Sequence, residues 1–273
     1  MNDEELAREL YVYADAAMHM LRESYDLCIP IYRENAELED IHQFVLTNLI
    51  SSCHQSSESS LLLVGHRRLW DSEILKRSVL EGTTKLLYIS IGNGNEILLK
   101  CDEFYRVIPE ITQINLHKKA TELLMKINDL STLWPDLKNQ LLSNEKLMEL
   151  EIKYPRNFRK MINQKWSFSE MVKTLEESKN EGFEIIKGTY YKYSFGSHFV
   201  HQDGDSISYM WDRNKSDVEG RTSSELAHGK STIKDILTLA MIRMEIYFGF
   251  HDLDTSVIDK WEQKVDEFYN IIK

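Results

Sequence analysis

The sequence predicts an all-α protein, built as an antiparallel helical bundle. Only four prolines and eleven glycines occur in 273 residues, and β-rich folds and loops use both residue types heavily. Apolar residues recur at intervals of three and four along most of the chain, which is the spacing of one face of an α-helix. We therefore expect long helices with few breaks between them.

The first two helices follow from this spacing. One begins at Asp3, repeats its apolar residues along one face and ends near Pro30. The next begins in the acidic segment 37–40. It can continue through the serine-rich segment 51–60, because that segment contains neither glycine nor proline.

The third helix has the clearest boundary in the sequence. It covers residues 70–91, with Asp71 or Ser72 as a candidate N-cap. The segment Gly92-Asn93-Gly94 ends it, because glycine and asparagine adopt the left-handed conformation that follows many helices.

In the middle of the chain, the sequence predicts shorter helices. Residues 95–107, 110–127 and 131–153 have helical spacing, and proline or asparagine interrupts them. The segment 131–182 is more polar and irregular, so we interpret it as a helical insertion on the core. A further helix is expected over 183–201.

In the C-terminal part of the chain, the sequence predicts a long loop and two helices. Residues 202–229 hold most of the glycine, aspartate, asparagine and serine of this region and are interpreted as the loop. Helices are expected over 231–250 and 256–272. Because no segment has the composition of a linker, we expect residues 1–273 to form a single helical domain.

Composition limits the function. The formal charge is -11 and the pI is about 5.4, which argues against a broad surface that coats nucleic acid, although a local basic pocket remains compatible. The three cysteines are too widely spaced for a metal-binding or disulfide motif, which favours reduced thiols. The acidic N-terminus and the lack of an apolar run of about 20 residues predict a cytoplasmic protein without a membrane span.

The first candidate site is Arg77 with Glu81 in the third predicted helix. The spacing of four residues places both side chains on one face, where they can form an ion pair. One alternative is a surface pair worth about 0.3–0.5 kcal/mol. The other is a cleft, because apolar residues flank the pair and a buried pair of this kind is costly to keep.

The second candidate site is in the predicted helix 183–201. Tyr193, Ser197 and His201 form one stripe, and Tyr190, Ser194 and His198 form a second stripe beside it. A histidine near the end of a helix can act as an acid or a base. The alternative is that these side chains fill a helix interface and one histidine caps carbonyl groups.

Together these motifs resemble a widespread bacterial helical family of unknown function. Its pattern is Arg-x3-Glu in an apolar helix followed downstream by Tyr-x3-Ser-x3-His, and its layout is similar to the HEPN superfamily of small helical nucleotide-binding and ribonuclease proteins. The matching positions here are Arg77, Glu81, Tyr193, Ser197 and His201.

One feature departs from the HEPN pattern. HEPN ribonucleases use an arginine and a histidine on one late helix, with four to six residues between them. The pair with such a spacing here is Arg221 and His228, and it falls in the predicted loop 202–229. Catalysis by the motif residues would therefore require Arg77 and His201 to meet from different helices.

Metal and cofactor chemistry is not expected. His198 and His201 have the spacing of two ligands on one helix, with Asp203 and Asp205 beyond, but a metal site needs three or four ligands. No dinucleotide-binding loop, P-loop or serine-hydrolase motif occurs. The sequence thus predicts no metal and no cofactor.

Two functional hypotheses remain. In the first, the protein is a metal-independent ribonuclease or nucleotide-acting effector of a toxin or anti-phage system. Arg77 and Lys192 would bind a phosphate of RNA or a nucleotide, Glu81 would orient Arg77, and His201 would transfer a proton. Tyr193 and Ser197 would position His201, and the remaining substrate contacts would come from His198 and Tyr190.

The second hypothesis is a non-catalytic binding or interaction module. The same residues would then form a buried polar network that fixes the packing of the helices, and the protein would bind a small ligand, a protein partner or a second copy of itself. The two hypotheses differ in one spatial prediction. Catalysis requires Arg77 and His201 to face a common cavity, bordered by the mobile loop 202–229.

Overall fold

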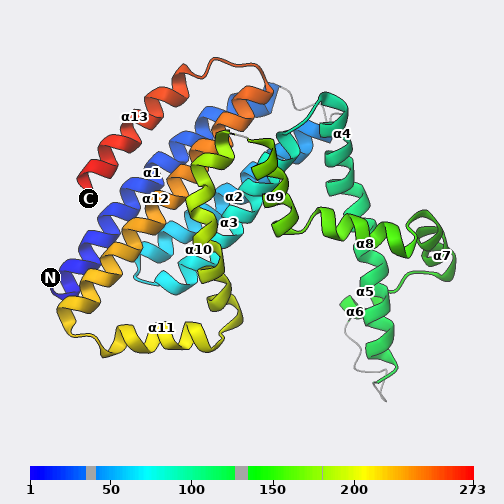
Figure 1. Cartoon of the computed structure of the whole chain (residues 1–273), viewed down its shortest axis with the longest axis horizontal. Helices are drawn as coiled ribbons and strands as arrows, with labels where there is room; N and C mark the ends of the chain where they lie inside the picture. Colours follow the sequence, from blue (N-terminus) through cyan, green and yellow to red (C-terminus); the bar gives the residue numbers. More distant parts are fainter. Residues whose placement is uncertain (35–40, 127–134, 180) are drawn as a thin grey trace. The chain divides into compact units, whose positions relative to one another are not determined.

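The computed structural model describes residues 1–34, 41–126, 135–179 and 181–273, and these ranges form helices joined by short turns (Figure 1). They contain no strand. The prediction of an all-α fold is therefore confirmed. The chain divides into two compact units, which we describe separately: Met1–Ile91 with Thr174–Lys273, and Gly92–Lys173.

The first unit is a bundle of long helices. Helices α1, α2, α3 and α12 pack side by side, α10 packs on α3, and α13 packs on α1 and α12 (Figure 1). Consecutive helices α2 and α3 run antiparallel, as do α12 and α13 (Figure 1). The helices of this unit are α1 (Asp3–Glu34), α2 (Ile41–Gly65), α3 (Leu69–Ser90), α10 (Glu181–His201), α11 (Gly204–Lys215), α12 (Val218–Phe250) and α13 (Ser256–Ile271).

The core of this unit comes from the apolar stripes that the sequence predicts. Their spacing of three and four residues turns one face of each helix inward. Side chains with no exposed surface include Leu6, Leu10, Leu21, Leu46, Leu61, Leu86, Ile89, Ile233 and Leu237.

The serine-rich part of α2 also faces the interior. Ser57 accepts a hydrogen bond at 3.3 Å from the guanidinium of Arg243, which is buried and also donates to Thr83 at 3.2 Å. Small residues let the helices approach closely: a Cβ added at Gly82 of α3 would lie 2.3 Å from Cys53 Sγ of α2. The small and hydroxylic residues of α2 and α3 therefore allow tight packing and satisfy a buried cation.

The second unit has a smaller core of its own. Buried Ile111, Ile114, Leu150, Tyr154 and Ile162 form it. Glu103 is also buried and accepts hydrogen bonds from Lys165 Nζ and Trp166 Nε1. The elements of this unit are α4 (Gly94–Asp102), the π-helical turn η1 (Glu103–Val107), α5 (Ile108–Leu124), α6 (Pro135–Asn139), α7 (Asn144–Lys153), α8 (Arg156–Lys165) and the beginning of α9 (Phe168–Ser178).

Several predicted boundaries are wrong. Helix α1 continues past Pro30 to Glu34. Helix α3 begins at Leu69 with Arg68 at the N-cap position, so neither Asp71 nor Ser72 is the cap. Ser72 is buried, and its hydroxyl lies 2.9 Å from that of Ser60.

Two more differences concern the middle of the chain. Pro109 does not separate two helices, because α4, η1 and α5 follow one another without a break and the proline lies in the first turn of α5. The single helix expected over 131–153 is two helices, α6 and α7, and Ser143 caps the second. Part of that expectation, at 131–134, lies outside the described residues.

The predicted long loop at 202–229 is wrong. Asp203 caps α11 by accepting from the backbone of Asp205 and Ser206, and Asp217 caps α12 by accepting from Gly220. Asp203, Gly204, Asp217 and Gly220, which suggest a loop, lie at helix starts, where such residues are favoured. Helix α12 therefore begins at Val218, far earlier than the expected residue 231.

The remaining expectations concern membrane spans, cysteines and domain organisation. Within the described ranges, no helix is long and apolar enough to cross a membrane. Cys28, Cys53 and Cys101 are buried free thiols. A single domain over 1–273 with an insertion at 131–182 stays a prediction.

Candidate functional site

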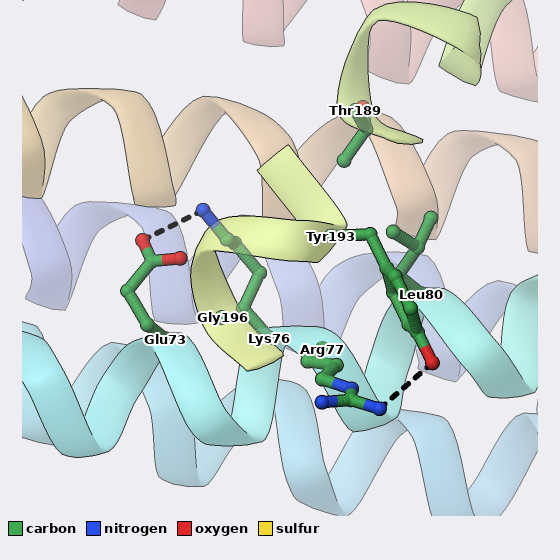
Figure 2. A pocket seen from close by; sticks show the side chains of 7 residues that line it. All are labelled: Glu73, Lys76, Arg77, Leu80, Thr189, Tyr193 and Gly196. Atoms are coloured by element: carbon green, nitrogen blue, oxygen red, sulfur yellow. Dashed lines mark hydrogen bonds and ion pairs between the residues drawn. The ribbon is translucent and has the colours of Figure 1, made fainter. Parts of the chain in front are cut away.

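Arg77, Glu81 and Tyr193 form a triangle of hydrogen bonds between α3 and α10. Arg77 donates from Nε to Glu81 at 3.2 Å. It also donates from Nη2 to the hydroxyl of Tyr193 at 2.8 Å, the bond drawn in Figure 2. Tyr193 in turn donates to Glu81 at 2.8 Å. The Arg77 guanidinium also lies 4.4 Å from the centre of the Tyr193 ring, within the range of a cation–π contact. The structure thus joins both sequence motifs.

This triangle is half-buried. The side chains of Arg77 and Glu81 are 19% and 32% exposed, so the pair is neither a surface pair nor sealed in the core. Burial raises the pKa of Tyr193, and the hydrogen bond to Glu81 raises it further. The phenol therefore stays protonated and acts as a donor to Glu81.

Tyr190 extends the contact one turn earlier in α10. Its hydroxyl lies 2.9 Å from Thr84 Oγ1 of α3, and its ring packs against Phe183. Burial raises the pKa of Tyr190 to about 12. A phenol held in this way supports the packing of α10 on α3, and it is not poised to exchange a proton near neutral pH.

A second polar network lies deeper, between α3 and α12. Glu73 Oε1 accepts from Lys76 Nζ at 2.7 Å and from Thr232 at 3.1 Å, and it lies 2.8 Å from His228 Nε2. Lys76 also donates to Asp235 at 3.1 Å. Glu73 and Lys76 are only 2% and 5% exposed, so this is a buried ion network.

The charges of this network stabilise one another. Burial by itself would raise the pKa of Glu73, but the hydrogen bond from His228 and the charge of Lys76 outweigh it and hold the pKa at about 2. Burial would likewise lower the pKa of Lys76, whereas Asp235 and Glu73 raise it above its ordinary value. Both groups therefore stay charged in the folded protein.

A small chamber separates the two networks. Its volume is about 10 Å³, and it is lined by Glu73, Lys76, Arg77, Leu80, Thr189, Tyr193 and Gly196 (Figure 2). Glu73 Oε2 and Arg77 Nη1 are buried, and no described residue gives either atom a hydrogen-bond partner. A volume of this size admits about one water molecule and no larger substrate.

His201 lies apart from the triangle. It is exposed at the end of α10, eight residues after Tyr193, which is about 12 Å along a helix axis. It lines neither the chamber nor the larger cavity, and none of the described residues forms a hydrogen bond or ion pair with its side chain. Ser197 is half-buried, and the side chains of Lys192 and Ser194 lie outside the described residues.

His198 belongs to a different group at the start of α11. Its Nδ1 lies 2.7 Å from Asp203 Oδ2 and 3.7 Å from Asp205 Oδ2. These three side chains offer ligand atoms within 4.8 Å of one another, so they could approach one metal ion. Asp203 already has two structural roles, as the N-cap of α11 and as the partner of His198. The expectation of no metal stays a prediction.

A larger cavity lies between α3, α10 and α11. Its volume is about 540 Å³, and it is lined by Arg67, Arg68, Trp70, Asp71, Ile74, Phe199, Gln202, Ser206, Ile207 and Met210. The segment after residue 201 therefore does border a cavity, although it does so as a helix. This cavity includes neither Arg77 nor His201, and the cavity that the two residues were expected to share stays a prediction.

The deeper network was not foreseen from the sequence, although a signal exists. Polar residues recur on one face of α12 at intervals of four and three: Arg221, Glu225, His228, Thr232 and Asp235. All of them have polar contacts with α1, α3 or the turn before α3. The stripe was not recognised because residues 202–229 were interpreted as a loop, and a loop does not place residues at helical spacing on one face.

Comparison with known proteins identifies a family. A family model described as a family of unknown function, DUF5677, matches residues 43–218, which is more than half of the chain. The match covers α3, α10 and α11, and with them both the triangle and the larger cavity. No curated protein and no solved structure matches the chain. The chain therefore belongs to the DUF5677 family of unknown function.

Proposed function

We propose that this protein is a non-catalytic binding module, in which the Arg77 triangle fixes α10 on α3 and thereby shapes the larger cavity. The proposal is supported by the contacts of the motif residues, which bind one another. Arg77, Glu81 and Tyr193 hydrogen-bond one another, and the chamber beside them has room for about one water. This chamber has no space for a larger substrate.

The observation that carries the proposal is the separation of Arg77 from His201. Proton transfer requires a base within hydrogen-bond reach of the reacting group, about 2.6–3.2 Å or one water away. His201 is exposed at the end of α10, about eight residues of helix beyond the triangle. A role in packing accounts for Arg77, Glu81 and Tyr193 without His201.

The buried network supports the same function. Glu73, Lys76 and Asp235 lock α3 against α12 through ion pairs of 2.7 and 3.1 Å. Charges buried in this way specify one arrangement of the helices, since any other arrangement would leave a charge unpaired. We place this module in the cytoplasm, where its three buried free thiols stay reduced.

A second candidate function, metal-independent cleavage of RNA, is favoured by one observation. Arg221 and His228 both lie on α12, seven residues apart, so they project from nearly the same face of one helix. This is the arrangement that the resemblance to HEPN ribonucleases implies. Both side chains are engaged, however: Arg221 with Asp3 at 2.8 Å and His228 with Glu73 at 2.8 Å.

One experiment separates the two functions. The purified protein is incubated with total RNA and a labelled oligoribonucleotide in EDTA, beside the variants Arg77→Ala, His201→Ala and His228→Gln. Expression in bacteria is followed by growth. A binding module leaves the RNA intact and growth unchanged in every case, while Arg77→Ala lowers only the free energy of unfolding. RNA cleavage that His228→Gln abolishes would establish the second function and overturn the first.

A further inference from the structure

The larger cavity has the dimensions of a small-molecule site. Its volume of about 540 Å³ falls within the range of roughly 300–1,000 Å³ typical of such sites. Its walls come from the start of α3, the end of α10 and the first half of α11, all in the first compact unit. Polar and apolar groups are both present, as in sites that orient a ligand.

One end of the cavity is positively charged. Arg68 is exposed, lies at the N-cap position of α3 and, among the residues that the structure describes, has no side-chain hydrogen bond or ion pair. Arg67 beside it is neutralised by Asp3 at 2.8 Å and Glu225 at 2.9 Å. The positive end of the α3 dipole adds to the charge of Arg68. Arg68 is thus the cation at this end that is available to a ligand.

A second guanidinium adjoins the cavity wall. Arg213 lies 4.4 Å above the ring centre of Trp70, and its nearest described polar contact is His228 Nδ1 at 3.4 Å. Burial lowers the pKa of Arg213, and the described carboxylates form no ion pair with it. An anion near Trp70 would gain from this charge as well as from Arg68.

The rest of the wall is apolar and partly uncovered. The rings of Trp70 and Phe199 pack at 4.3 Å, with Arg213 on Trp70, so this aromatic wall is held in place. Ile207 and Met210 line the cavity yet remain 62% and 43% exposed. Covering such side chains with the apolar or aromatic body of a ligand is favourable, and methionine adapts to varied shapes.

Asp71 and Gln202 complete the lining with polar groups. The Asp71 carboxylate would repel a second negative charge near it, so the anionic group belongs on the Arg68 side. Asp71 can accept a hydrogen bond from a hydroxyl or amino group, and Gln202 can both donate and accept. These requirements together describe a ligand with one anionic head, an aromatic body and a few hydrogen-bonding groups.

We propose that this cavity binds an organic phosphate with an aromatic body, with the phosphate on Arg68 and the aromatic part against Phe199, Ile207 and Met210. The inference rests on the proposed binding function and names its ligand class. A nucleotide and a simple aryl phosphate share this chemistry, so the experiment must distinguish these two sources.

The test is isothermal titration calorimetry of the full-length protein with AMP, phenyl phosphate, adenosine and inorganic phosphate. Saturable binding is expected for AMP and phenyl phosphate, with adenosine and inorganic phosphate each at least about tenfold weaker, because each lacks half of the required contacts. Tighter binding of AMP than of phenyl phosphate would identify a nucleotide site. The reverse order would identify a site for simpler aryl phosphates.

Arg68→Gln is the decisive variant, since Arg68 is exposed and its loss leaves no described partner unpaired. Loss of one charge-assisted contact should weaken binding by about tenfold. Arg22→Gln, which alters an exposed arginine of α1 that pairs with Glu58, is the matched control and should leave binding unchanged. Circular dichroism confirms that both variants are folded.

Two results would overturn the inference: no saturable binding of either aromatic phosphate, or equal binding by wild type and Arg68→Gln. Neither result contradicts the proposed binding function, because the RNA assay tests that function separately. If RNA stays intact while no aromatic phosphate binds, the ligand class is wrong and the binding module stands. Cleavage of RNA would instead remove the function on which the inference rests.

Discussion

Gly196 of α10 lies directly over the side chain of Arg77, so that a Cβ added at Gly196 would be 3.4 Å from Arg77 Cβ and 3.5 Å from the carbonyl oxygen of Glu73. A single added carbon fits at van der Waals distance, whereas a larger side chain has no room. The position therefore tests whether α10 is docked on α3 as described.

Gly196→Leu should destabilise the protein by about 1–3 kcal/mol, because the added side chain must displace Arg77 or lift α10 from α3. Gly188 is the matched control. It lies in the same helix, is exposed and has no atom within 4 Å of an added Cβ. Gly188→Leu should stabilise by roughly 0.5–1 kcal/mol through helix propensity. Urea unfolding followed by circular dichroism measures both, and equal effects would contradict the docking of α10.

Arg77→Ala should lower the free energy of unfolding by about 2 kcal/mol, because it removes hydrogen bonds to Glu81 and Tyr193 together with the cation–π contact. In a double-mutant cycle with Tyr193→Phe, the two losses should not add, since both residues contact Glu81. Arg22→Ala, which breaks an exposed pair with Glu58, should cost under about 1 kcal/mol. Strict additivity of Arg77→Ala and Tyr193→Phe would show that the triangle is not a unit.

Much of the fold could be predicted because it depends on local and periodic signals. The stop after α3 is clear in Gly92-Asn93-Gly94, and Asn93 indeed forms a capping box with Glu96 at the start of α4. The spacing of the apolar residues in α1 and α3 indicates which face of each helix is buried. The first half of α12 could not be predicted in this way, because its inward face carries charges such as Glu225 that are satisfied by distant partners.

The candidate site could be predicted only in part. The spacing of Arg77 and Glu81 is a property of one helix, and the motif pointed to Tyr193 as a further member. The place of His201 depends on how far α10 extends beyond α3, which no local pattern encodes. Glu73 was missed because a lone glutamate in a helix usually faces solvent, and its burial depends on His228, which is 155 residues away.

His198 should titrate above the ordinary imidazole range. The hydrogen bond to Asp203 is the main cause that raises its pKa, and the charge of Asp205 adds to it. Asp203→Asn should lower the pKa of His198 while keeping α11 capped, because asparagine is also a favoured N-cap. Asp205→Asn is the control and should have a smaller effect, since its carboxylate lies 3.7 Å away. An NMR titration of the imidazole measures each value, and an unchanged pKa in Asp203→Asn would contradict this pairing.

Glu73 should make stability depend on acid pH. Its pKa in the folded protein is about 2, below its ordinary value of 4.5. A carboxyl with a lowered pKa contributes stability above its unfolded pKa and loses that contribution as the pH falls towards the folded pKa. Glu73 contacts Lys76 on its own helix and His228 and Thr232 on α12. The lowered pKa of Glu73 contributes about 3 kcal/mol to the free energy of unfolding at neutral pH.

Glu73→Gln should therefore lower the free energy of unfolding by about 3 kcal/mol at pH 7. The difference in this free energy between the variant and wild type, called the gap below, should narrow steadily as the pH falls from 4.5 towards 2. Urea unfolding at stepped pH values measures the gap, and other carboxylates cancel because both proteins contain them. Glu177→Gln, at an exposed position of α9, should show a small gap with little dependence on pH. A Glu73→Gln gap that stays constant down to pH 3 would mean that the carboxylate is not held by His228 and Lys76, since only a group held in its charged form gives stability that acid removes.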